Sequence, residues 1–205
     1  ATAAVAGLTT AQIAAFSTTQ VNSLTTAQSK ALSTAQLDAI SSTGLAGLST
    51  ADVAVLSSAQ IGALSSSTAD TSAITTAQIA AIATAAVAGL TTAQIAAFST
   101  AQINVLTTAQ LVSLSTTQIG AFSSQDVVGL STSQINVLKT AQVAALSTAQ
   151  IAAIETADVA GLSTSQFAVL SSAQVGALSA STAQTSAITT AQIAAITTAA
   201  VAGLT

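Results

Sequence analysis

The sequence predicts an all-α solenoid of very short helices, with one helix for each eight-residue repeat. Three observations support this fold class. An octad repeats along the whole chain, each octad carries the signature of a helix N-terminus, and alanine, glutamine and leucine are good helix formers. The chain has 205 residues, with 10 glycines and no proline, so the turn residues that many short strands require are scarce.

The octads account for nearly every residue. They fill residues 1–64, 67–178 and 181–204, with two-residue insertions at 65–66 and 179–180. Their consensus is S/T-T-A-Q-I-A-A-L, in which position five is aliphatic or phenylalanine in 22 octads and position eight is apolar in all 25. We therefore expect one continuous repeat array over residues 1–205, as a segment of a longer chain.

Each octad is expected to begin a new helix. A Ser or Thr at position one followed by Gln at position four is a capping box, in which each side chain bonds the backbone N–H of the other residue. The apolar residues on either side form a hydrophobic staple, as in the segment Leu146 to Ile151. One long helix is disfavoured, because apolar spacings of three and five alternate and match neither a 3.5- nor a 3.6-residue period.

A β-solenoid is the alternative fold. Eight is an even number, so positions five and eight of a strand would face opposite sides, and Val, Ile and Thr favour strands. The lack of turn residues argues against this alternative but does not eliminate it.

The composition excludes most chemistry. The chain has no His, Cys, Met, Trp or Tyr, and only 2 basic and 6 acidic residues, with a net charge of −4. Imidazole bases, thiolate nucleophiles and the usual zinc ligands are therefore missing, and a basic patch for nucleic acid cannot form. No apolar run approaches the length of a membrane span. We expect no enzyme, no catalytic, cofactor-binding or metal-binding residues, no cofactor, and no small-molecule or nucleic-acid partner.

The carboxylates are the only candidate ligands. They are Asp38, Asp52, Asp70, Asp126, Glu155 and Asp158. Four of them, Asp52, Asp70, Asp126 and Asp158, replace Gln at position four, and we interpret these as capping acids on a solvated edge. Glu155 and Asp158 lie three residues apart in one octad, and a cation site formed by these two acids is the weaker alternative.

The remaining charges are interpreted as solvated. Lys30 and Asp38 both occupy position six of successive octads, and they would pair if successive octads stacked. Together with Lys139 at position one, the charges mark positions one, four and six as facing water.

Three polar residues interrupt the apolar row at position five. Thr71 and Thr185 each follow a two-residue insertion and lie 114 residues apart, which suggests a corner, seam or register mark in an assembly. Ser29 has no such counterpart, and the sequence offers no explanation for it.

The octads resemble those of very long, low-complexity surface proteins of Gram-negative bacteria, described as adhesin-like or secreted repeat proteins. The segment Leu90 to Ile95, LTTAQI, carries this resemblance, and it extends over the whole chain. It implies export to the cell surface and a role in a filament, sheath or fibre. With so few charges to keep copies apart, we expect a structural protein that self-associates into an extracellular filament. The alternative is a monomeric adhesin stalk or an ice-binding surface.

Overall fold

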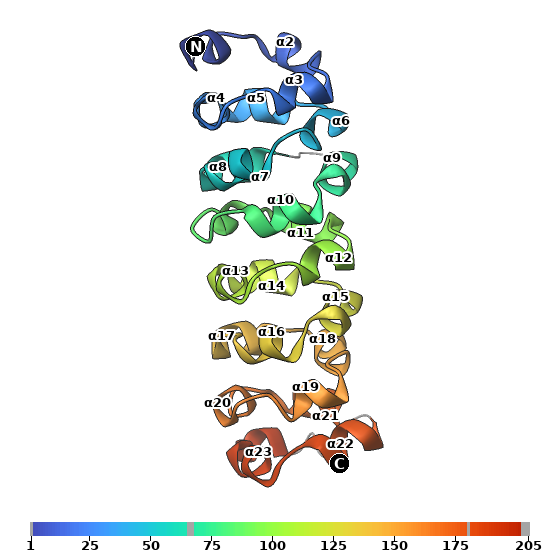
Figure 1. Cartoon of the computed structure of the whole chain (residues 1–205). Helices are drawn as coiled ribbons and strands as arrows, with labels where there is room; N and C mark the ends of the chain where they lie inside the picture. Colours follow the sequence, from blue (N-terminus) through green and yellow to red (C-terminus); the bar gives the residue numbers. More distant parts are fainter. Residues whose placement is uncertain (1, 65–67, 180, 202–205) are drawn as a thin grey trace. The chain divides into compact units, whose positions relative to one another are not determined.

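The computed structural model describes residues 2–64, 68–179 and 181–201; at 68–70 and 199 only the backbone is described. Within these ranges all regular structure is helical, and no strand is present. The predicted all-α solenoid of very short helices is therefore confirmed, and the β-solenoid alternative is wrong. Figure 1 shows the helices following one another in the order of the octads.

The chain divides into two compact units, Ala1–Ser113 and Leu114–Thr205. The helices of the first unit are α1 Thr2–Ala6, α2 Thr10–Ala14, α3 Thr18–Asn22, α4 Thr26–Ala31, α5 Thr34–Asp38, α6 Ser42–Leu45, α7 Thr50–Ala54, α8 Ser58–Ala63, α9 Thr68–Ala73, α10 Thr76–Ala81, the 3-10 helix η1 Val87–Gly89, α11 Thr92–Ala97, α12 Thr100–Asn104 and α13 Thr108–Ser113. Those of the second unit are α14 Thr116–Gly120, α15 Ser124–Gly129, α16 Thr132–Asn136, α17 Thr140–Ala144, α18 Thr148–Ala152, α19 Thr156–Val159, α20 Thr164–Phe167, α21 Ser172–Leu178, α22 Thr182–Ala187, α23 Thr190–Ala195 and α24 Thr198–Val201.

A single octad shows why each helix is so short. Before α18, the Ser147 hydroxyl accepts from the N–H of Gln150 at 3.2 Å, and the Gln150 Oε1 accepts from the N–H of Ser147 at 2.7 Å. The last turn tightens, because the N–H of Ile154 donates to the Ile151 carbonyl three residues back at 3.1 Å. The next octad then opens with extended backbone at Glu155 before α19 (φ −66°, ψ 150°). The capping boxes predicted from the sequence are thus formed, and each one restarts the chain in a new direction.

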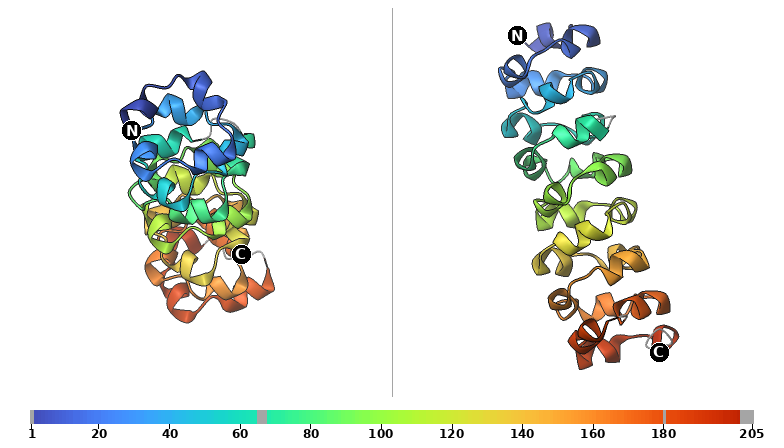
Figure 2. Two further views of the ribbon diagram at one scale, coloured as in Figure 1. Left: turned by 45° about the horizontal axis from the view of Figure 1, so that its top comes forward. Right: turned by 90° about the vertical axis from the view of Figure 1, so that its right-hand side faces the viewer.

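Within each unit, the helices that pack together are three octads apart. In the first unit α1 contacts α4 and α5 contacts α8; in the second unit α14 contacts α17 and α18 contacts α21. Apolar side chains from positions five and eight fill the space between the coils, and Ile61, Leu111 and Ile151 are completely buried. Figure 2 shows these short helices stacked in successive coils within each unit.

The octad at residues 83–90 departs from the pattern. It has Ala86 in place of the capping Gln, makes no side-chain cap bond, and forms only the short 3-10 helix η1. This helix packs against α8, and a Cβ atom added to Gly89 would overlap the Ser58 carbonyl. Glycine is therefore required at residue 89 by the close approach of two backbones.

The second insertion is closed by the threonine that follows it. The Thr185 hydroxyl donates to the carbonyls of Ser179 (3.1 Å) and Ser181 (2.9 Å), so position five holds the ends of the extra residues together. The equivalent Thr71 is buried, and the first insertion at 65–66 lies outside the described residues. The suggested seam or register mark in an assembly stays a prediction.

Candidate functional site

The glutamine at position four joins two coils, and it is the most elaborate polar feature of the described chain. The Gln36 Oε1 accepts from the N–H of Ser33 (2.8 Å) and so caps its own helix. At the other end of the same amide, Nε2 donates to the carbonyls of Leu8 (2.8 Å) and Val5 (3.2 Å) in the octad four places earlier. The side chain is 4 % exposed, so both ends of the amide are satisfied away from water.

The same bond recurs through both units. Where no insertion lies between the two octads, Nε2 reaches the position-eight carbonyl 28 residues earlier: Gln60 to Leu32 (2.8 Å), Gln110 to Ile82 (2.7 Å), Gln150 to Phe122 (2.8 Å), Gln166 to Leu138 (2.8 Å) and Gln174 to Leu146 (2.7 Å). The backbone therefore returns to the same place every 28 residues, or three and a half octads. We call this set of bonds the glutamine ladder.

The insertions lengthen the sequence spacing without changing the partners. Where an insertion lies between the two octads, the spacing is 30 residues: Gln78 to Leu48 (2.7 Å), Gln184 to Ile154 (2.8 Å) and Gln192 to Leu162 (2.6 Å). Each glutamine still bonds position eight of the octad four places earlier. The extra residues are thus absorbed locally, and the register of the ladder is kept.

The structure corrects the predicted environment of position four. Asp52 is 1 % exposed, and Asp126 and Asp158 are 3 % exposed, so these acids are buried between coils and do not lie on a solvated edge. Their capping role is confirmed at two positions. The Asp52 carboxylate accepts from the N–H of Ser49 at 3.1 Å, and the Asp126 carboxylate accepts from the N–H of Ser123 at 2.8 Å. The side chain of Asp70 lies outside the described residues.

The Asp52 Oδ1, which is the carboxylate oxygen that does not serve the cap, and the Ser29 hydroxyl are buried in the first unit without a hydrogen-bond partner. A carboxylate has no N–H to donate, so Asp52 cannot repeat the bonds that glutamine makes to the preceding coil. Ser29 is completely buried where other octads place an aliphatic side chain. Both residues are local defects in the repeat.

The two acids of the cation-site alternative lie in different environments. Glu155 is exposed and makes no side-chain cap bond, while Asp158 is buried three residues later. Among the described residues, no group of three or more acidic side chains gathers in one place. A shallow depression beside the second insertion is lined by Glu155 together with Ile154, Thr156 and Gln184. Its one carboxylate has no second titratable group in that lining, so no acid–base pair is assembled there.

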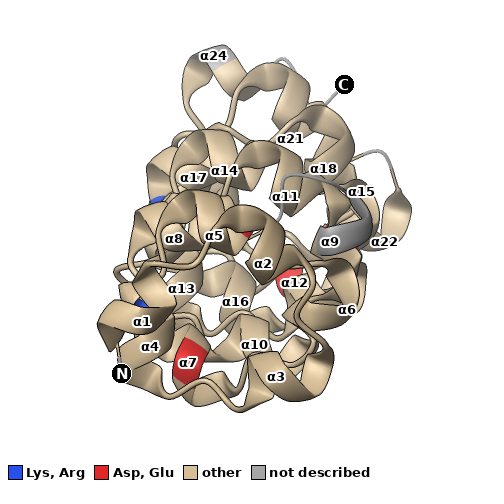
Figure 3. Ribbon diagram, turned by 90° about the horizontal axis from the view of Figure 1, so that it is seen from above, with Lys and Arg blue, Asp and Glu red and all other residues tan. Residues whose placement is uncertain are grey.

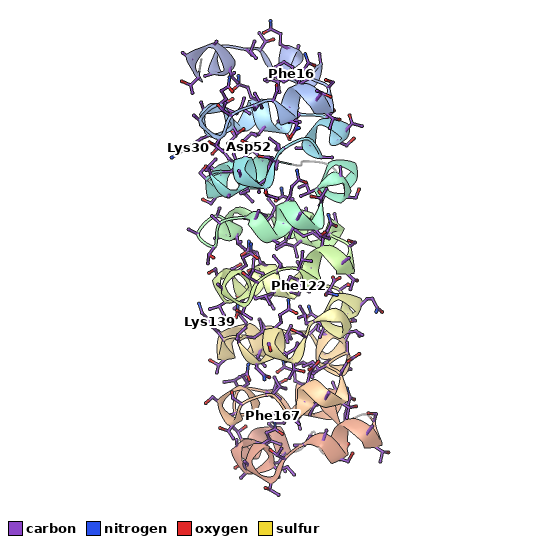
Figure 4. The ribbon with its side chains drawn as sticks, viewed as in Figure 1. Phe16, Lys30, Asp52, Phe122, Lys139 and Phe167 are labelled. Carbon is purple, nitrogen blue, oxygen red and sulfur yellow. The ribbon has the colours of Figure 1, made fainter. Side chains whose placement is uncertain are left out.

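The four charged residues at positions one and six behave differently from the buried acids of position four. Lys30, Asp38 and Lys139 are exposed, as Glu155 is. The Lys30 and Lys139 side chains project outward from their coils, whereas Asp52 lies inside (Figure 4). Lys30 and Asp38 belong to successive octads, but the helices that pack are three octads apart, so the premise of their pairing is wrong. Figure 3 shows how few charged residues the ribbon carries.

The described helices are all short, and none is both long and apolar enough to cross a membrane.

Sequence reasoning found the cap but missed the ladder. Position four is Gln in 17 octads and Asp in 4, and it is never Glu, although Glu completes a capping box as well as Gln does. This preference for Gln over Glu is the feature of the sequence that indicates the ladder. Only the amide carries an N–H donor, so a position that selects Gln over Glu needs a donor as well as an acceptor.

A comparison with known protein families identifies the same kind of repeat in the chain. The ALTTAQ repeat matches five segments of the chain, at residues 1–26, 30–66, 96–124, 121–153 and 151–181. No curated protein matches the chain. The five segments together span well over half of the sequence, and they contain the capping box and the glutamine ladder described above. The chain belongs to the ALTTAQ repeat family.

Proposed function

We propose that the chain is a structural protein whose coils self-associate into an extracellular filament, fibre or sheath. The glutamine ladder is the observation that carries this proposal. The amide of the position-four glutamine is fully used by bonds within the protein, because it caps its own helix and joins that helix to an earlier coil. The hydroxyl at position one is used by the helix cap. Apart from Lys30 and Asp38 at position six, the groups left on the outside at positions two, three and six are neutral and mostly small, which suits packing between copies.

The additive construction of the coils supports a mechanical role. Each coil contacts only its neighbours within a unit, so length can grow by whole octads without a new kind of contact. Export to the cell surface is part of the same proposal and derives from the resemblance to bacterial surface repeat proteins. The proposal assigns no catalytic centre, metal or cofactor to the chain.

Electron microscopy and light scattering of the purified chain test this proposal. We expect concentration-dependent assemblies with a constant width. A monodisperse monomer at every concentration tested would contradict self-association and would favour a monomeric stalk.

An ice-binding surface is the second candidate. The threonines at position two, such as Thr116, Thr132 and Thr148, are exposed and are not the residues that cap the helices. A repeated row of threonine hydroxyl and methyl groups is a surface that can order water. Measurement of thermal hysteresis tests this candidate, and a value no larger than that of an unrelated protein at the same concentration excludes it.

A further inference from the structure

Two exceptions to the octad pattern meet in the first unit. Ser29 replaces an aliphatic residue at position five in α4, and Asp52 replaces Gln at position four in α7. These helices are three octads apart and pack together, as α3 and α6 do. In that second pair, a Cβ atom added to Gly44 at position four would lie 3.4 Å from the Cγ2 atom of Val21 at position five. Ser29 and Asp52 occupy the same two positions, so their side chains are neighbours between the coils.

The oxygen atoms at this place lack partners. The Asp52 Oδ1 and the Ser29 hydroxyl are both buried without a hydrogen bond. The 28-residue spacing directs position four of this octad to the Leu24 carbonyl, which accepts no hydrogen bond in the part of the chain that the structure describes. The corresponding carbonyls of Leu8 and Leu32 each accept from a glutamine amide at 2.8 Å. A carboxylate oxygen and a carbonyl oxygen only accept, so Asp52 and Leu24 cannot bond each other.

The two substitutions also leave room and an unbalanced charge. Serine is smaller than the aliphatic residues that fill position five elsewhere, and aspartate is one methylene shorter than glutamine. Within the described residues Asp52 forms no ion pair, and Lys30, next to Ser29 in the sequence, projects outward from its coil (Figure 4). A buried charge is costly unless it is paired. One carboxylate among neutral oxygen atoms is balanced by a single positive charge.

The second unit has a buried acid without the serine. Asp158 in α19 is buried at position four, and α19 packs against α16 three octads earlier. The residue at position five of α16 is Ile135, which is buried and has the usual aliphatic side chain. Neither the hydroxyl nor the extra room is present beside Asp158, so the combination at Asp52 is more than the presence of an acid at position four.

We propose that Asp52, Ser29 and the Leu24 carbonyl bind one monovalent cation of the size of sodium between the coils. The carboxylate supplies the balancing charge, and the hydroxyl and the carbonyl supply the neutral oxygen ligands that hard cations accept. The bound ion replaces the missing amide donor, and it joins α7 to the earlier coil as the glutamine ladder does in other octads. This site goes beyond the proposed filament and does not depend on it.

The test measures urea denaturation of the whole chain, at one protein concentration, in sodium chloride and in choline chloride of equal ionic strength. Choline is too large for the site and therefore reports the general effect of salt. We expect the equilibrium constant for unfolding to fall by about tenfold more in sodium than in choline as the salt rises from about 1 mM to about 100 mM, because an ion that binds only the folded chain stabilises it.

Two variants should abolish the difference between sodium and choline. Asp52→Gln removes the carboxylate and supplies the amide donor, while Ser29→Val fills the room with an aliphatic side chain. Without sodium the unpartnered oxygen atoms only carry their cost of desolvation, so neither variant is expected to destabilise the ion-free chain. Asp158→Gln is the matched control, because it also removes a buried carboxylate at position four, and it should keep the full sodium response.

Equal stability of the unmodified chain in sodium and choline would overturn the proposal and show that water or a proton occupies this place. A sodium response that persists in Asp52→Gln, or that disappears in Asp158→Gln alone, would also overturn it. The line width of the sodium NMR signal provides a second measurement on the folded chain. The signal should be broader with the unmodified chain than with Asp52→Gln, and equal widths would contradict binding at Asp52.

Discussion

The side-chain amide of Asn136 occupies the space that any side chain at residue 161 would need. A Cβ placed on Gly161 would lie 2.7 Å and 3.0 Å from the two terminal atoms of that amide. With its nitrogen assigned from the hydrogen-bond network, the amide donates to the carbonyl of Gly161 at 2.6 Å. Gly161 follows Asn136 by 25 residues in the sequence, and the same separation joins Asn22 to Gly47 and Asn104 to Gly129. Each asparagine of the chain is thus followed by a glycine 25 residues later.

Gly161→Ala should therefore destabilise the second unit. The new methyl group must displace the Asn136 amide and break its bond to the Gly161 carbonyl, and overpacking of this kind costs about 1–3 kcal/mol. Urea denaturation followed by far-UV circular dichroism measures the loss. The matched control is Gly120→Ala, because the nearest atom to a Cβ there is the Ala145 carbonyl oxygen at 4.0 Å. The control should be neutral or slightly stabilising.

The double variant Asn136→Ala/Gly161→Ala tests whether the pair is coupled. Removing the amide clears two of the three closest atoms and leaves the Thr132 Cγ2 at 3.0 Å, so the double variant should recover a large part of the stability lost in Gly161→Ala. Additive losses would show that the two residues act independently.

Ser29→Ala should stabilise the first unit. The Ser29 hydroxyl is completely buried and has no hydrogen-bond partner, and its removal relieves a desolvation cost of about 1–3 kcal/mol without adding volume. The midpoint of urea denaturation should rise. Ser124→Ala, at an exposed position two, should leave the midpoint unchanged. A lower midpoint for Ser29→Ala would show that the hydroxyl has a stabilising role.

Asp52→Gln should restore the ladder at a position where it is interrupted. Glutamine keeps the acceptor for Ser49 and removes the buried oxygen that has no partner. Its new amide donor follows the 28-residue spacing to the Leu24 carbonyl. We expect a gain of about 1–2 kcal/mol, from one satisfied hydrogen bond and one removed buried charge. Asp38→Gln, a similar substitution at an exposed residue, should change stability by less than about 0.5 kcal/mol.

Much of the fold could be predicted from the sequence, because its determinants are local. The capping box of Ser147 and Gln150 spans four residues, so helix starts, helix length and octad boundaries are all visible in one octad. The number of octads in a turn could not be predicted. The number of octads in a turn depends on how far the short extended segments rotate the chain. Only a contact across the turn, such as the bond from Gln150 to Phe122 28 residues earlier, reveals it.

The environment of position four was mispredicted for the same reason. A capping residue on an isolated helix faces water, so the octad alone predicts a solvated position for Asp52 and Asp126. The neighbouring coil covers that side of the helix, and this burial arises from the superhelical turn and not from the octad itself. The unequal use of Gln and Glu at position four was the one local trace of the buried contact.

The most direct test of the glutamine ladder is the stability of Gln150→Glu compared with that of Gln12→Glu. Both variants keep the acceptor that caps the helix, but only Gln150 is buried, with Nε2 bonded to the carbonyls of Phe122 (2.8 Å) and Ile119 (3.1 Å). The ladder predicts that Gln150→Glu loses about 3 kcal/mol or more in urea denaturation at neutral pH, because a charged acceptor is buried against two carbonyls. Gln12→Glu, measured at a concentration where the chain is monomeric, should change by less than about 0.5 kcal/mol. Equal, small effects of the two substitutions would contradict the ladder and leave glutamine with its capping role alone.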